Sequence, residues 1–217
     1  MKKLTSTDWA RILESMGVKP AMFVRWADAF AAEAQVDKFS LGAAEIDDWL
    51  ANILHESDML ETLSENLNYK TSALISRFGR HRISIEDSQR YGRNADHPAD
   101  QRAIANCIYG GAWGRENLGN IGPDDGWKYR GAGLIQATGL VNMKFLEGIT
   151  GLPLVANPDL LRRPGPESIK VAIAWWEGKV PDSVIGSIPR TRKAVNGGDN
   201  GLAHVTDMTN RLGDALT

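Results

Sequence analysis

Hydrophobic residues recur along this chain mostly at the spacing of amphipathic helices. Near the N-terminus they fall at i, i+3, i+4 and i+7, at Trp9, Ile12, Leu13 and Met16. Ser6 or Thr7 could cap that helix, and Pro20 suits the first turn of the next one. The same spacing predicts further helices at residues 46–54, 72–78, 100–109, 140–149, 166–176 and 202–212. Alternating, strand-like patterns are scarce, so the sequence predicts a mainly α-helical fold.

One segment departs from the helical spacing. Eight glycines lie between residues 110 and 133, and the segment continues to Gly139. We expect a long loop here, and long loops inside compact domains are usually functional. Trp113, Trp127 and Tyr129 lie in it and could either stack on a ligand or anchor the loop in the core.

Composition narrows the class of protein. The 217 residues suit a single domain, which we expect to span residues 1–217 without a separate binding module. Hydrophobic residues make up 42% and charged residues 24%, which excludes a disordered chain and a membrane-spanning one. The net charge of -2 gives no reason to expect nucleic-acid binding.

The single cysteine and the N-terminus carry further expectations. Cys107 belongs to a helically spaced apolar set with Ile104 and Ile108 and is interpreted as a small buried hydrophobic residue rather than a nucleophile. No other His or Cys stands at metal-ligand spacing, so no metal and no cofactor are expected. The N-terminus lacks the apolar stretch of a signal peptide, so we expect synthesis and folding in the cytoplasm.

Candidate chemistry lies between residues 55 and 69, in HESDMLETLSENLNY. Glu56 ends a predicted helix beside Trp49 and Ile53, where partial burial would favour an acid role. Glu65 follows nine residues later, and Glu61 between them resembles a solvent-facing charge. Spacing alone is weak support, because glutamates this close are usually surface charges. His55 could be a second proton carrier or a half-buried residue at the helix end.

The chain resembles glycoside hydrolase family 19, and specifically its phage-type endolysin branch. The matching stretches occur in the family's order: LHESDMLETLSENLNY (54–69), AIANCIYGG (103–111), DDGWKYRGAGLIQATGLVNM (124–143), NPDLL (157–161) and VNGGDNGL (195–202). The resemblance implies a lysozyme-like, bilobed helical domain with a central substrate cleft. Two positions depart from many relatives, Ala132 and His204, which leaves the sugar contacts open.

Residue roles follow from the resemblance. It makes Glu56 the acid catalyst and Glu65 the base, with Thr138 holding the attacking water. Carboxyl groups far enough apart to admit water give inversion of configuration. Gln136 and Asn196 match groove-lining residues.

Other interpretations of these and neighbouring residues remain open. Thr138 could instead be a helix N-cap, and Asn196 could form a helix C-terminal turn. Tyr69, Trp127 and Tyr129 are further candidates for sugar contacts. We expect Arg130 to hold a carboxylate across the cleft and so help to keep Glu65 charged.

The resemblance implies an endolysin that hydrolyses β-1,4 bonds of bacterial peptidoglycan and lyses the host cell. The alternatives are a chitinase acting on N-acetylglucosamine polymers, a lytic transglycosylase and a non-catalytic wall-binding protein. As an endolysin the chain would act as a monomer on peptidoglycan strands, without nucleic acid and without stable membrane association. It would remain in the host cytoplasm and reach the periplasm and wall only after a holin permeabilised the membrane.

Overall fold

The structure, a computed structural model, describes residues 3–215 and is mainly helical, as the sequence predicts. The chain forms two compact units. Unit 1 contains the described residues before Ser64, the segment Gly133–Ile135 and the described residues from Leu160 onward, and unit 2 contains Ser64–Ala132 and Gln136–Asp159. The short 3-10 helix η2 (Pro158–Arg162) bridges the passage of the chain from unit 2 back to unit 1.

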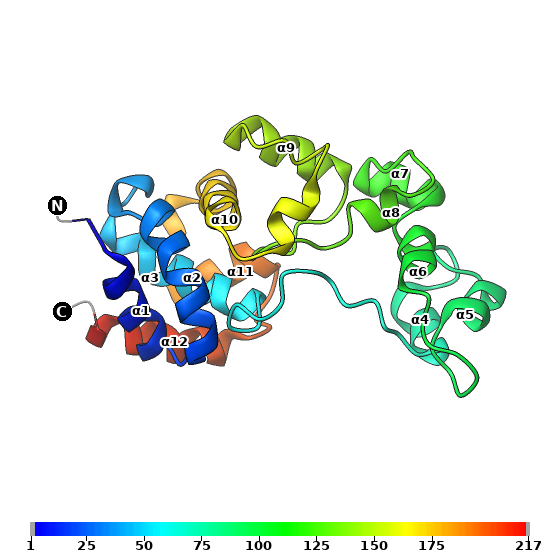
Figure 1. Cartoon of the computed structure of the whole chain (residues 1–217), viewed down its shortest axis with the longest axis horizontal. Coiled ribbons are helices and arrows are strands. Elements are labelled where there is room, and N and C mark those ends of the chain that lie inside the picture. Colours follow the sequence, from blue (N-terminus) through cyan, green and yellow to red (C-terminus); the bar gives the residue numbers. More distant parts are fainter. Residues whose placement is uncertain (1–2, 216–217) are drawn as a thin grey trace. The chain divides into compact units, whose positions relative to one another are not determined.

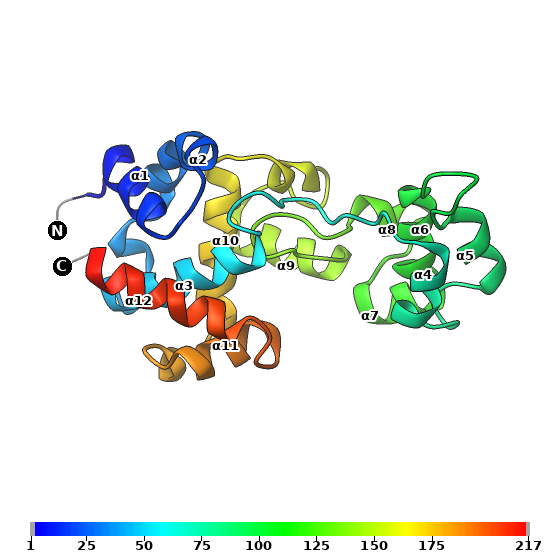
Figure 2. The same cartoon turned by 90° about the horizontal axis from the view of Figure 1, so that it is seen from below.

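Unit 1 is built around one central helix. Its elements are α1 (Ser6–Ser15), α2 (Pro20–Glu33), η1 (Val36–Lys38), α3 (Ala43–Glu56), α10 (Pro166–Lys179), η3 (Asp182–Val184), α11 (Ile188–Asn196) and α12 (Leu202–Ala215). Helix α1 packs on α2, and α12 lies along α3 (Figures 1 and 2). Helix α3 is buried on nearly every side, and a helix buried all round belongs to the core.

Aromatic rings fill much of the unit 1 core. The Trp49 ring of α3 lies 6.0 Å from Phe30 and 5.1 Å from Phe39 between centroids, with edge-on geometry in both pairs. Phe30 also contacts Trp9 at 4.9 Å, so helices α1, α2 and α3 share one aromatic cluster. The hydrophobic spacing seen in the sequence is therefore the spacing that builds this core.

The N-terminal cap differs from the prediction. Thr5, rather than Ser6 or Thr7, caps α1: its hydroxyl accepts from the Asp8 backbone N–H at 3.2 Å. The Asp8 carboxylate in turn accepts from the Thr5 backbone N–H at 2.8 Å. This reciprocal capping box satisfies two backbone donors at once, which neither Ser6 nor Thr7 does.

Unit 2 contains α4 (Thr71–Phe78), α5 (Ile85–Tyr91), α6 (Gln101–Ile108), α7 (Gly111–Leu118), α8 (Asp125–Lys128) and α9 (Leu140–Thr150). Its core gathers the side chains of Leu67, Leu74, Phe78, Ile83, Ile104, Ala105 and Ile108. Asp100 caps α6 by accepting from the Ala103 N–H, as predicted. Within the described residues, β structure is limited to isolated bridges such as Ala132 with Ala137.

The prediction of a long loop at 110–139 is only partly confirmed, because this segment contains α7 and α8. Glycine is a poor helix former, and its abundance here suggested a loop. Packing overrides that propensity. A Cβ at Gly114 would overlap the Tyr109 backbone, and a Cβ at Gly126 would overlap the Ala105 carbonyl. These glycines therefore allow close backbone contact rather than a flexible loop.

None of the described helices combines the length and the apolar character needed to cross a bilayer.

Candidate active site

Helix α3 presents three polar side chains on one face, at Asp48, Asn52 and Glu56. Their spacing of four residues places them one above another along the helix. Asn52 donates from Nδ2 to the Asp48 carbonyl at 2.8 Å. The Asp48 carboxyl accepts from the Gly186 N–H at 2.8 Å, and burial raises its pKa. Glu56 is the last residue of the helix.

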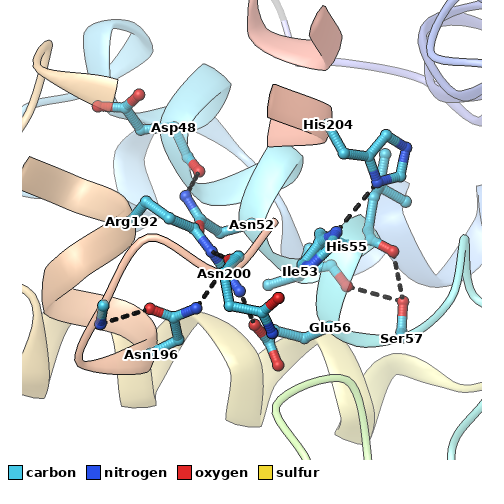
Figure 3. Close-up of polar contacts among 12 residues, drawn as sticks. Asp48, Asn52, Ile53, His55, Glu56, Ser57, Arg192, Asn196, Asn200 and His204 are labelled. Atoms are coloured by element: carbon cyan, nitrogen blue, oxygen red, sulfur yellow. Dashed lines mark hydrogen bonds and ion pairs between the residues drawn. The ribbon is translucent and has the colours of Figure 1, made fainter. Parts of the chain in front are cut away.

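Arg192 of α11 connects this face to the rest of unit 1 (Figure 3). Its Nη2 contacts Glu56 Oε1 at 2.6 Å, and its Nη1 donates to Asn52 Oδ1 at 3.0 Å. Its Nε donates to the Asn200 carbonyl at 2.7 Å. The Arg192 side chain is 1% exposed and that of Glu56 is 29% exposed. From the sequence we expected only that the Glu56 carboxyl is partly buried. The structure shows in addition that a buried cation, Arg192, contacts that carboxyl.

Glu56 also borders a small cavity of about 50 Å³ in unit 1. The lining is mostly apolar: Asn52, Ile53, Glu56, Ile135, Trp175, Trp176 and Val195. Glu56 lies beside Ile53 here, as the helical spacing predicts. Of its two carboxyl oxygens, Oε1 is held by Arg192, and no described residue binds Oε2.

The end of α3 is sharply defined. Asp58, Met59 and Leu60 all have left-handed φ angles, of 49°, 57° and 71°. Such angles are costly for residues with a side chain, so the surrounding structure must enforce them. The buried Ser57 hydroxyl does part of this, since it donates to the Ile53 carbonyl at 2.7 Å and accepts from the Leu60 N–H at 3.0 Å. This turn stops the helix at Glu56.

His55 pairs with His204, one of the positions that departs from many relatives. Their Nδ1 atoms lie 3.0 Å apart, and their rings meet edge-on at 5.3 Å. Burial lowers the pKa of His55, with the charge of Arg192 acting in the same direction. Gly201 packs directly against the other side of the His55 ring. His55 is thus the half-buried residue at the helix end that the sequence allowed.

Asn196 ends α11 and closes the turn that follows. Its Oδ1 accepts from the Gly198 N–H at 2.8 Å, and its Nδ2 donates to the Asn200 carbonyl at 2.8 Å. Gly197 takes the left-handed C-terminal conformation, so the predicted turn is present. Because Asn200 also accepts from Arg192, Asn196 stabilises one of the partners of that arginine.

Unit 2 holds Glu65 through both carboxyl oxygens. The Tyr109 hydroxyl donates to Oε1 at 2.6 Å, and the Gly131 N–H donates to Oε2 at 3.1 Å. Gln136 also packs against Gly131, because a Cβ there would lie 2.8 Å from Gln136 Oε1. Neither of these two hydrogen bonds comes from Arg130, whose Nη1 donates to the Trp127 carbonyl at 2.9 Å.

Thr138 is not the N-cap of α9, which begins after Gly139 without a side-chain cap. Its hydroxyl donates to the Gln136 carbonyl at 3.1 Å, and its own carbonyl accepts from Asn142 Nδ2 at 2.7 Å. Gln136 itself has a left-handed φ of 47°. The turn therefore constrains Thr138 while leaving its side chain half-buried.

The aromatic candidates of unit 2 differ in exposure. Tyr129 is 3% exposed and donates its hydroxyl to the Val155 carbonyl at 3.0 Å, so it anchors the core and offers no ring face to a sugar. Trp127 is half-buried, with the Arg130 guanidinium 3.7 Å from its ring centroid. Tyr69 is half-buried against Phe78 at 5.3 Å.

Two side chains that bind the candidate glutamates, one in each unit, were not identified from the sequence. Arg192 lies 136 residues after Glu56, and no local pattern links them. Tyr109 lies in the quoted segment AIANCIYGG but carried no assigned role. Which buried arginine or tyrosine faces a given carboxylate depends on the tertiary structure.

Comparison with known proteins identifies the family. No protein-family model matches the chain. A Haemophilus influenzae protein (strain ATCC 51907 / DSM 11121 / KW20 / Rd) described as a glycosyl hydrolase family 19 domain-containing protein is 31% identical over 159 residues, covering 71% of each chain.

Two solved structures share the fold. Chitinase C from Streptomyces griseus HUT6037 matches with a TM-score of 0.54 and 19% identity, covering 94% of this chain and 91% of that one. A glutamate-to-glutamine variant of chitinase C matches with a TM-score of 0.53, 17% identity and the same coverage. Such identities establish the fold alone. The Haemophilus influenzae relative shows that this chain belongs to glycoside hydrolase family 19 and is a glycoside hydrolase.

Proposed function

We propose that this hydrolase is an endolysin that cleaves β-1,4 bonds between N-acetylated amino sugars of bacterial peptidoglycan, with inversion of configuration. Family membership supplies the glycoside hydrolysis. The sequence motifs of the phage-type branch support the substrate. The observation that carries the mechanism is the difference between the two carboxyl groups. Both oxygens of Glu65 accept hydrogen bonds, whereas one oxygen of Glu56 has no partner among the described residues.

Glu56 is the proposed acid. Arg192 occupies Oε1, so a proton delivered by Glu56 would be carried on Oε2. Apolar side chains line the neighbouring cavity, and a sugar bound beside Glu56 would exclude water there. The proton passes to the leaving glycosidic oxygen as the bond to the anomeric carbon breaks.

Glu65 is the proposed base, and Thr138 positions the water. Hydrogen bonds to both oxygens orient the carboxyl group that would accept the proton. Water forms the new bond to the anomeric carbon and gives its proton to Glu65. We propose Gln136, Asn196, Tyr69 and Trp127 as sugar contacts.

Glutamine substitutions test the two roles. Glu56→Gln and Glu65→Gln should each remain folded by circular dichroism at 25 °C and lose hydrolysis of purified peptidoglycan by orders of magnitude. Glu61→Gln is the matched control, because Glu61 is exposed and its carboxyl group pairs with Lys19 at 2.6 Å. Near-normal wall hydrolysis by Glu56→Gln or Glu65→Gln would refute the corresponding role.

Chitin is the second candidate substrate, favoured by the fold shared with a chitinase C. Turnover of purified peptidoglycan and of chitin oligomers, measured side by side, separates the two substrates. Mass spectrometry of the products separates hydrolysis, which adds one water per cut, from transglycosylation, which yields an anhydro sugar. Binding to walls with no new reducing ends would instead indicate a wall-binding protein.

We also propose a route by which the protein reaches the cell wall. As an endolysin, the protein would act as a monomer, gather in the host cytoplasm and reach peptidoglycan after a holin permeabilises the membrane. Expression alone should leave bacterial cells intact, whereas co-expression with a holin should lyse them. Lysis at the same rate without a holin would contradict this route.

A further inference from the structure

Two hydrogen-bond donors hold the carboxyl group of Glu65. Its Oε1 accepts from the Tyr109 hydroxyl at 2.6 Å and its Oε2 accepts from the Gly131 N–H at 3.1 Å. Two donors on opposite oxygens determine the direction in which the carboxyl plane faces. Hydrogen bonds to an ionised acceptor are shorter and stronger than neutral ones, and the contact with Tyr109 has that length.

Tyr109 is itself firmly held. It follows the last residue of α6, and its ring packs against the core of unit 2. Its backbone N–H donates to the Ala105 carbonyl at 2.9 Å, and its carbonyl accepts from Asn120 Nδ2 at 2.8 Å. Gly114 packs against the same backbone without room for a side chain. The hydroxyl therefore points at Glu65 from a fixed support.

Arg82 lies behind this pair. Its Nε donates to the Ile108 carbonyl at 2.8 Å, and its guanidinium lies 3.7 Å from the Trp113 ring centroid and 5.3 Å from that of Tyr109. Burial lowers the pKa of Arg82, and the negative charge of Glu65 acts in the opposite direction. Arg82 is thus close enough for its positive charge to act on Glu65 without a hydrogen bond to it.

We propose that Tyr109 and Arg82 are positioning residues for the base, holding Glu65 as an oriented carboxylate. This inference rests on the proposed role of Glu65. Burial and the nearby carboxylate raise the pKa of the Tyr109 phenol, so Tyr109 remains an O–H donor throughout the working pH range. The titratable or charged groups that face this pair are Arg82 and Tyr69.

The test is Tyr109→Phe, which removes the hydroxyl and keeps the ring. We expect kcat on peptidoglycan to fall about tenfold with KM little changed, because orientation of the base matters only in the reacting complex. The acidic limb of the pH–activity profile should move to higher pH, because a hydrogen bond to a charged group is lost. Arg82→Gln should move that limb in the same direction.

Tyr91→Phe is the matched control. Tyr91 packs against the same core and loses the same hydroxyl on substitution, and among the described residues no hydrogen bond joins it to Glu65. Its rate and pH profile should equal those of the unsubstituted protein.

A spectrum recorded without catalysis provides a second readout. In protein labelled with ¹³C at glutamate carboxyl carbons, the Glu65 signal is identified by its loss in Glu65→Gln. The chemical shift of that signal should change in Tyr109→Phe, which removes a hydrogen bond to the carboxyl group, and should stay the same in Tyr91→Phe. An unchanged Glu65 signal in Tyr109→Phe, or equal effects of Tyr109→Phe and Tyr91→Phe, would overturn the inference.

Different results would refute the base role of Glu65 and the positioning role of Tyr109. Near-normal hydrolysis by Glu65→Gln refutes the base role itself. An inactive Glu65→Gln together with an unshifted Tyr109→Phe profile refutes only the positioning role of Tyr109.

Discussion

Replacing Arg192 by methionine removes three donors from the interior of unit 1 and keeps much of the side-chain volume. Asn52 Oδ1 and the Asn200 carbonyl each lose a partner, and the Glu56 carboxylate loses its cation. Removing one member of a buried ion pair costs about 3–5 kcal/mol. The Glu56 side chain is 29% exposed and water can partly replace the lost contact, so we take the lower end, about 3 kcal/mol.

This free energy predicts a measurable change in melting temperature. For a chain of this size, 1 kcal/mol corresponds to about 2–4 °C, so Arg192→Met should melt about 6–12 °C below the unsubstituted protein. Circular dichroism at 222 nm during heating is the assay. Arg192→Lys should fall between the two, because an ammonium keeps the charge but cannot reproduce the planar fork of three donors.

A double-mutant cycle isolates the contact with Glu56. Arg192→Met should cost less when Glu56 is already glutamine, because no buried carboxylate is then left unpaired. The coupling should be about 1–3 kcal/mol. Melting of Arg192→Met within about 2 °C of the unsubstituted protein, or the same loss in both backgrounds, would refute the reasoning.

Three further outcomes follow from the geometry. Gly201→Ala should destabilise the protein, because a Cβ would overlap the His55 ring and φ is +78°, whereas Gly198→Ala, with open space around it, should melt normally. Alkylation of Cys107 by iodoacetamide at pH 8 should be far slower than that of free cysteine, because burial raises the pKa of its thiol to about 11; equal rates would contradict this. Burial lowers the pKa of His55, so the unfolded chain binds more protons as pH falls below about 6.5. Stability should therefore decline there, and less so in His55→Gln, as melting curves from pH 8 to 5 would show.

Local sequence was sufficient for most helices. The spacing of apolar residues predicted the helices now seen as α1, α2, α3, α4, α6, α9, α10 and α12, with ends that differ by a few residues. Helices α7 and α8 were missed because their glycines argue against a helix. Those glycines are required by close backbone contacts, such as that of Gly126 with Ala105, and such contacts exist only after folding.

The candidate site residues also divide into those that the sequence identifies and those whose role only the tertiary structure shows. Glu56, at the end of a helical stripe, and Glu65, nine residues later, could be named from the sequence, as could the turn at Asn196. Whether Tyr129 contacts sugar or packs in the core depends on how deeply it is buried. No local sequence pattern predicts that burial. Its hydroxyl bonds to the Val155 carbonyl, 26 residues further along the chain.

The sequence by itself determined the helical class of this protein and supplied two candidate carboxyl groups, because helical periodicity and residue type are local properties. Only the tertiary structure decided what surrounds each carboxyl. Arg192 reaches Glu56 from 136 residues away, and Tyr109 reaches Glu65 from 44 residues away. Charge and hydrogen bonding act through space over a few ångströms, so the environment of each glutamate depends on distant segments that only folding brings together.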